Sequence, residues 1–296
     1  MTPLRQRMLQ DMRLRGLAAS TQKIYLGAVA RLASFYGRSP EELSEGEIRD
    51  YFVHLIIKRR LSPPSVTIAL CAIKFFYERS LERKWPIFEL VRPAREKKLP
   101  IVLDHGEVCD ILGKVRLPNY RACLIATYTC GLRIHEATAI CPTAIDKQRM
   151  TLRLRGKGNK DRYVPLPDAT LAVLRRYWKS HRSPTWMFPS LNSGRKASKS
   201  PEPTRPISHA SVRLAFYQAL RQSSVRKAAT VHSLRHSYAT NLLEAGVDIR
   251  VLQAYLGHAN LRTTNIYTHL TRKLHQAALE PIHRLARDLD NLSHPS

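Results

Sequence analysis

Along residues 1–90, apolar side chains recur every three or four positions, which is the spacing of one face of an α-helix. Ser20 and Thr21 can cap a helix that runs through Ala33. The apolar stripe predicted for this helix consists of Ile24, Tyr25, Ala28, Val29 and Leu32.

Two further helices in this segment are marked by the residues that start them. Ser44 followed by Glu47 is the pattern of a capping box. Ser62-Pro63-Pro64-Ser65 starts another helix. The apolar face predicted for that helix consists of Ile68, Ala69, Ala72, Ile73 and Phe76. Residues 1–90 are therefore predicted to form a small bundle of packed helices.

The pattern is interrupted between residues 91 and 100. Prolines in this stretch oppose helix formation and its basic residues keep it solvated, so we predict an exposed interdomain linker. A second domain is predicted over residues 101–296. Asp104 and Glu107 cap its first helix, and Asn119 to Thr129 forms a core helix that ends just before Gly131.

Two short stretches then alternate apolar with polar residues, as paired β-strands do. They are Met150–Leu154 and Tyr163–Leu166, and Gly156-Lys157-Gly158 forms the turn between them. The predicted fold class is mainly α, with a small antiparallel β-sheet in the second domain. Residues 192–206 are rich in Ser, Pro, Lys and Arg and are predicted to be a surface loop.

The last predicted helices are bounded by glycines. Gly246 ends a helix that carries His232 and Arg235, because glycine tolerates the left-handed conformation after a helix. Asp248 then caps a helix that Gly257 stops, so that His258 projects from a turn. Thr263 and Thr264 begin a helix with Tyr267, and an apolar stripe follows at Leu270, Leu274, Ala277, Ala278 and Ile282.

The charge of the chain favours a polyanionic partner. The formal net charge is +26 and the pI about 10.4. Residues 1–92 carry 16 Lys+Arg against 9 Asp+Glu, and residues 93–296 carry 33 against 14, so both parts can touch DNA. A generic basic protein is the alternative, but 44% hydrophobic residues over 296 positions can build two cores.

Neither a secretory signal nor a membrane span is expected. Residues 1–5 lack an apolar signal core, and no run approaches the roughly 20 apolar residues of a membrane helix. The 5 cysteines show no C-x-x-C spacing and are expected to be reduced and mostly buried thiols. A cytoplasmic location is predicted.

Six residues in five local motifs form a set suited to attack on a phosphodiester. Two arginines can clamp the phosphate, since the planar guanidinium group of each can bind two phosphate oxygens and stays charged. A histidine is a suitable base for a tyrosine nucleophile, a lysine can protonate the departing sugar oxygen, and a second histidine can donate to a phosphate oxygen. The set comprises Arg133, Lys157, His232, Arg235, His258 and Tyr267.

These motifs resemble those of the tyrosine recombinases, or phage-integrase family, especially its Xer-like and integron-like members. The family order is Arg, Lys, His-x-x-Arg, His or Trp, and Tyr. Here Lys157 follows Arg133 by 24 residues, and Arg235 follows His232 by 3. His258 follows Arg235 by 23 residues, and Tyr267 follows His258 by 9. Glu136 matches the acidic residue that supports the active site in many members.

The resemblance covers nearly the whole chain and implies a fold, a reaction and partners. A helical, SAM-like core-binding domain would span residues 1–90 and bind DNA. Residues 101–296 would form an α/β catalytic domain with a C-terminal tail helix. The implied activity is site-specific recombination of double-stranded DNA through a 3′-phosphotyrosyl link and a Holliday junction, without metal or other cofactor. Four protomers would assemble on two sites. Predicted DNA contacts in the catalytic domain are Lys160, Arg162, Arg195, Lys196 and Lys199.

Several alternatives stay open. A type IB topoisomerase uses similar chemistry on one duplex, and a regulator could bind DNA without cleaving it. His232 and His236 have the i, i+4 spacing of zinc ligands, although no Glu follows His232 directly. The tail could pack on a neighbouring protomer or on its own domain. His135 replaces the small residue of many relatives, with no role assigned. Integration, excision and dimer resolution all fit, and a mobile element is mildly favoured.

Overall fold

The computed structural model describes residues 2–93, 99–155, 161–190 and 205–257. The chain divides into two compact units, Met1–Lys98 and Leu99–Ser296. Within the described residues, no helix is long and apolar enough to cross a bilayer.

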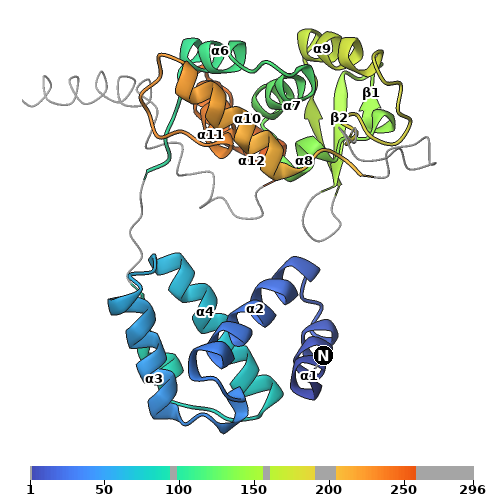
Figure 1. Cartoon of the computed structure of the whole chain (residues 1–296). Helices are drawn as coiled ribbons and strands as arrows, with labels where there is room; N and C mark the ends of the chain where they lie inside the picture. Colours follow the sequence, from blue (N-terminus) through green and yellow to red (C-terminus); the bar gives the residue numbers. More distant parts are fainter. Residues whose placement is uncertain (1, 94–98, 156–160, 191–204, 258–296) are drawn as a thin grey trace, which may run out of the picture. The chain divides into compact units, whose positions relative to one another are not determined.

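The first unit is helical throughout its described part (Figure 1). Its elements are α1 (Pro3–Leu14), α2 (Ala19–Tyr36), η1 (Pro40–Glu42), α3 (Glu45–Val53), η2 (His54–Lys58), α4 (Pro63–Phe75), η3 (Phe76–Ser80) and α5 (Ile87–Leu90). Helices α2 and α4 pack against each other, and η2 and η3 are π-helical turns that continue α3 and α4. The core that they enclose is apolar and includes Met12, Leu32, Ile48, Phe52, Ile73 and Tyr77.

Two of the predicted helix starts in this unit are confirmed. Ser44 and Glu47 form a capping box, in which the Glu47 amide donates to the Ser44 hydroxyl and the Ser44 amide donates to the Glu47 carboxylate. Helix α4 begins at Pro63, directly after Ser62. Helix α2, however, begins at Ala19 after Ala18 and has no side-chain cap, so the predicted Ser20–Thr21 cap is wrong.

The predicted apolar stripes are correct only in part. Ile24 and Ile68 are 48% and 43% exposed, whereas Val66, which the predicted stripe leaves out, is buried. The cysteines also differ from expectation, because Cys71 and Cys109 are exposed while Cys123 and Cys130 are buried. All 5 are free thiols.

The second unit combines helices with a small sheet. Its helices are α6 (His105–Gly113), α7 (Pro118–Thr129), α8 (Ile134–Thr138), η4 (Pro142–Ala144), α9 (Asp168–Trp178), α10 (His209–Gln222), α11 (Val231–Glu244) and α12 (Ile249–Leu256). The strands are β1 (Ile145–Asp146), β2 (Thr151–Arg155) and β3 (Asp161–Pro165). They form an antiparallel sheet in the order β1-β2-β3, with Leu152 opposite Val164. The predicted strand pair is confirmed, and β1 is an addition.

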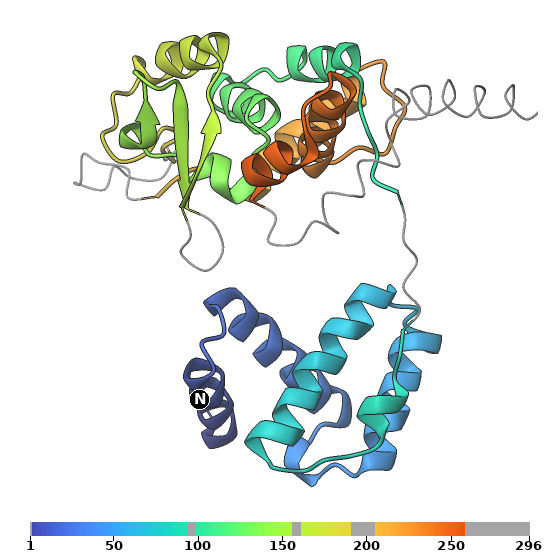
Figure 2. The same cartoon turned by 180° about the vertical axis from the view of Figure 1, so that it is seen from behind.

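Helix α7 occupies the middle of this unit. In both views it lies between the sheet with α9 on one side and α6, α10 and α11 on the other, while α12 contacts β3 directly (Figures 1 and 2). Its buried residues Cys123, Leu124 and Ala126 belong to an apolar core that also holds Leu152, Val164 and Phe216. The chain leaves this central helix at the point where the candidate site begins.

Candidate active site

A left-handed glycine carries the chain out of α7. Gly131 has φ +61°, and the amides of Gly131 and Leu132 donate to the carbonyls of Tyr128 and Thr127, which is a Schellman helix end. A Cβ at Gly131 would lie 2.5 Å from ring carbons of Tyr238, so the position demands glycine on steric grounds too. Arg133 follows two residues later as the N-cap of α8.

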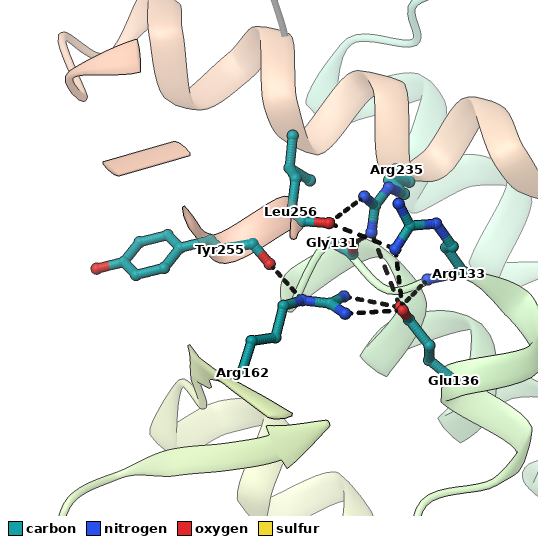
Figure 3. A network of polar contacts seen from close by, with 7 residues as sticks. All are labelled: Gly131, Arg133, Glu136, Arg162, Arg235, Tyr255 and Leu256. Carbon is teal, nitrogen blue, oxygen red and sulfur yellow. Dashed lines mark hydrogen bonds and ion pairs between the residues drawn. The ribbon is translucent and has the colours of Figure 1, made fainter. Parts of the chain in front are cut away.

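Glu136 is the centre of the site. Its carboxylate accepts from the backbone amide of Arg133 at 2.8 Å, as in one half of a capping box, and from Arg133 Nη1 at 3.0 Å. Arg162 on β3 donates to both carboxylate oxygens, from Nη1 and Nη2, at 2.8 Å each. Arg235 Nη1 lies 3.8 Å from Glu136 Oε2. Figure 3 shows the three guanidinium groups turned toward this one carboxylate.

The C-terminal carbonyls of α12 complete the network. Leu256 O accepts from Arg235 Nη2 at 2.6 Å and from Arg133 Nη1 at 3.4 Å, and Tyr255 O accepts from Arg162 Nε at 2.9 Å. Arg235 Nη1 also donates to Gly131 O at 2.6 Å. Positive side chains at a helix C-terminus stabilise the exposed carbonyl dipoles. Segments that are far apart in sequence are thereby joined at one point.

Burial separates the two arginines that were predicted to clamp a phosphate. The Arg133 side chain is 30% exposed, whereas that of Arg235 is 1% exposed. The Glu136 side chain is 2% exposed, and its burial raises the pKa of the carboxyl. The hydrogen bonds from Arg162 and from the Arg133 amide outweigh that effect and, with the charges of Arg162 and Arg235, lower the pKa to about 2. Glu136 is therefore ionised at any working pH.

Helix α11 carries His232 and Arg235 one turn apart, as predicted. His232 is exposed, and partial desolvation, followed by the charges of Arg235 and Arg133, lowers its pKa. His236 lies beside it, with the ring centroids 4.6 Å apart, and burial lowers its pKa to about 4. A neutral imidazole at His232 is the form that can accept a proton. In the described part of the chain, no cluster of three or more His, Cys, Asp or Glu side chains could hold a metal.

The predicted DNA contact at Arg162 is not supported by its surroundings. Its side chain is 10% exposed, and each guanidinium nitrogen donates to an acceptor within the protein. A signal for this placement exists in the sequence, because alternation along β3 puts Arg162 on the same face as the buried Val164. Strand alternation does not predict the hydrogen-bond partners of Arg162, because two of its three bonds reach Glu136, 26 positions away in the sequence.

Other predicted site residues lie outside the described ranges. These are Lys157, Lys160, Arg195, Lys196, Lys199, His258 and Tyr267.

His135, to which the sequence assigned no role, is exposed and borders an open pocket with Cys141, Arg153 and Arg155. Desolvation lowers its pKa.

Comparisons with known proteins agree with this architecture. The sequence model of the phage integrase family matches residues 102–273, and that of the phage integrase N-terminal SAM-like domain matches residues 4–87. The Sinorhizobium fredii protein y4qK, an inferred integrase/recombinase, is 41% identical over 289 residues, which cover 97% of this chain and 91% of that protein. The tyrosine recombinase XerD of Caulobacter vibrioides is 31% identical over 294 residues, which cover 92% of this chain and 93% of that protein.

A solved structure has the same fold. The site-specific recombinase XerH, in a post-cleavage complex with its palindromic difH substrate, superposes with a TM-score of 0.65 at 20% identity, covering 90% of this chain and 82% of that one. Two matching domains and relatives that align along almost their whole length define an enzyme that breaks and rejoins DNA. The chain belongs to the phage integrase family and is a tyrosine recombinase.

Proposed function

We propose that this protein recombines DNA site-specifically, with Tyr267 as the nucleophile. The observation that carries the proposal is the convergence of Arg133 and Arg235 on Glu136, with His232 one turn from Arg235. The two arginines are 102 positions apart in sequence, and each lies within 4.0 Å of the same carboxylate. A pair of fixed guanidinium groups next to a neutral imidazole suits phosphoryl transfer, in which charge stabilisation dominates.

The proposed reaction conserves the number of phosphodiester bonds. The Tyr267 hydroxyl attacks the scissile phosphorus and gives its proton to His232, while the bond to the 5′-oxygen breaks. Lys157 protonates that oxygen, and a 3′-phosphotyrosyl link remains. The freed 5′-hydroxyl of a partner duplex then attacks the link and releases Tyr267, so strands exchange through a Holliday junction. Arg133, Arg235 and His258 would stabilise the phosphate oxygens, and Glu136 would support the two arginines.

We assign the remaining contacts to DNA backbone. Residues 1–90 form the core-binding domain in this proposal, residues 91–100 link it to the catalytic domain at 101–296, and the two clamp a duplex. Lys160, Arg195, Lys196 and Lys199 would touch phosphates, and the net charge of +26 supports such contacts. The XerH complex with difH is a precedent for the fold on DNA.

The proposed assembly is a tetramer on two DNA sites in the cytoplasm, with the C-terminal tail helix available to join protomers. Integration or excision of a mobile element is the favoured role. Its support is the similarity to y4qK, an inferred integrase/recombinase.

Covalent trapping tests the proposal. The protein is incubated in EDTA with sheared DNA from the organism that encodes it, and fragments linked to denatured protein are sequenced at their ends. Wild type, Tyr267→Phe and a control at an exposed tyrosine, Tyr217→Phe, are compared. We expect ends that cluster at one sequence, persist in Tyr217→Phe and vanish in Tyr267→Phe.

Other outcomes contradict the proposal in different ways. Scattered ends would indicate a topoisomerase-like enzyme. Tight binding without any adduct would indicate a DNA-binding regulator. An adduct that forms without EDTA but is lost when EDTA is present would indicate a metal requirement.

A further inference from the structure

All three guanidinium nitrogens of Arg162 donate to acceptors within the protein. Its two terminal nitrogens meet the two Glu136 oxygens in a parallel fork, and its Nε meets the carbonyl of Tyr255. This is a bidentate charged pair, the arrangement that fixes orientation as well as charge. Its side chain is 10% exposed, against 30% for Arg133. The position therefore suits a residue that acts through its neighbours.

The fork holds Glu136 in the orientation that the arginines of the site require. Glu136 Oε1 accepts from Arg162 Nη1 and from Arg133 Nη1 at 2.8 and 3.0 Å. Glu136 Oε2 accepts from Arg162 Nη2 and from the Arg133 amide, and it lies 3.8 Å from Arg235. Each oxygen is thus shared between Arg162 and Arg133. A carboxylate that loses the fork keeps only its bonds from Arg133 and its ion pair with Arg235, so its orientation, and that of Arg133, would be less fixed.

Arg162 also joins β3 to the end of α12. Its Nε donates to Tyr255 O, and Gly257, with φ +60°, lies against its side chain. A Cβ at Gly257 would be 2.8 Å from Arg162 Cδ, so the glycine permits this close approach. Leu256 O, one residue away, is the acceptor for Arg235 and Arg133. The same side chain therefore fixes the carboxylate and the helix end that hold the two phosphate-binding arginines.

We propose that Arg162 is a positioning residue for strand cleavage, which sets the geometry of Arg133 and Arg235 without touching DNA. This inference deepens the proposed function and rests on it. It assigns to Arg162 a role different from that of the neighbouring basic residues of the hairpin.

The test separates affinity from chemistry in the full-length protein. Arg162→Gln and Arg162→Lys are compared with Arg149→Gln, which removes an exposed arginine between β1 and β2. The DNA is a nicked duplex carrying the site found by covalent trapping, so that cleavage stops at the covalent adduct. The dissociation constant is measured by titration, and the rate of adduct formation is measured at saturating protein.

We expect Arg162→Gln to bind DNA as wild type does and to form adduct about 100-fold more slowly, the loss that a misplacement of about 1 Å can cause. Arg162→Lys should remain well below wild type, because an ammonium cannot form the fork and the Nε bond together. Arg149→Gln should form adduct at the wild-type rate. A weakened dissociation constant with an unchanged rate at saturation would mean that Arg162 contacts DNA and would overturn the proposal. Full activity of Arg162→Lys would overturn the geometric role.

A pH profile distinguishes positioning from loss of stability. Glu136 is faced by Arg133 from α8, by Arg162 from β3 and by Arg235 from α11, with His135 beside it in sequence. Arg162 contributes the largest effect that lowers the Glu136 pKa, while burial raises it. Without Arg162 the pKa rises, so the deficit of Arg162→Gln relative to wild type should grow as the pH falls from 8 toward 5.

A deficit that disappears on cooling would show that Arg162 only stabilises the fold. If Arg162→Gln does not fold, Arg162→Lys carries the same measurements. A failure of the proposed function is distinguishable, because wild type itself would then form no adduct at Tyr267.

Discussion

The two units of this chain bury different kinds of side chain. In the described part of the first unit, the buried core is apolar apart from Ser80. The second unit has an apolar core as well, but it also buries Arg235 and Glu136. Removing charges from water costs several kcal/mol per ion, which good geometry and extra hydrogen bonds can offset. The difference indicates that the first unit is packed for stability, whereas the second retains buried charge where its chemistry requires a fixed arginine.

The largest effect is expected from a cavity in the first unit. Phe52 is 1% exposed, and Phe52→Ala should lower the free energy of unfolding by about 3–5 kcal/mol. Because the two units have separate cores, the loss should appear in the first unit alone. Hydrogen exchange on the full-length protein would locate it, with the exposed Phe35→Ala as a control. Equal loss of protection in α7 would contradict independent cores.

Removal of the buried arginine should affect chemistry more than packing. Arg235→Ala takes a donor from the proposed phosphate site, which costs about 3–4 kcal/mol of transition-state stabilisation, or 10²–10³ in rate. Single-turnover adduct formation measures it, and Arg221→Ala on the surface of α10 is the matched control. Arg235→Ala should also melt at a lower temperature, because Gly131 O loses its Arg235 donor and Leu256 O keeps only the longer bond from Arg133. A wild-type rate of adduct formation in Arg235→Ala would show that Arg235 is not part of the active site.

Acid should weaken the second unit through Glu136. Its pKa falls from the model-peptide value of 4.5 to about 2 on folding, so the folded state binds the proton less well. The contribution to stability, roughly 3 kcal/mol, is complete above pH 4.5 and is lost as the pH falls toward 2. Urea unfolding between pH 7 and 3 would show a steeper decline for wild type than for Glu136→Gln. Parallel curves would mean that Glu136 is not tightly paired.

The smallest effects are expected from the two predicted capping boxes, Ser44–Glu47 in the first unit and Asp104–Glu107 in the second. Ser44→Ala and Asp104→Ala each remove a side chain that accepts from the third residue of its helix, at a cost of about 1 kcal/mol. Each substitution should lower the stability of its own unit only, as measured by hydrogen exchange in α3 and α6. A loss that spreads to the other unit would show that the units unfold together.

Local signals account for the parts of the fold that the sequence predicts well. Both capping boxes, the Asp248 cap and the glycines at 246 and 257 work within a few residues of the chain, and all are confirmed. The apolar stripes are less accurate, since Ile24 and Ile68 are exposed. A helical period of 3.6 leaves a residue at the border of a face undecided until the neighbouring helix is known.

The network around Glu136 could be predicted only in part. Residue types and spacing indicated Arg133, His232 and Arg235, and the family resemblance indicated Glu136. The backbone acceptors at Gly131 and Leu256, however, carry no signal in their side chains. The role of Arg162 depends on partners that folding brings from α8 and α12. Long-range polar contacts of this kind follow from the assembled fold rather than from any local pattern.

The convergence of three arginines on the Glu136 carboxylate, and of two of them on Leu256 O, has a consequence for how this protein can vary. A change at any of these positions alters the partners of the others, so the effects of single substitutions in the network will not add. Efforts to redirect such an enzyme to new DNA should keep Arg133, Glu136, Arg162 and Arg235 unchanged, or change them together. Within this set of four residues, a change that is tolerated is expected to need a second change at another of them.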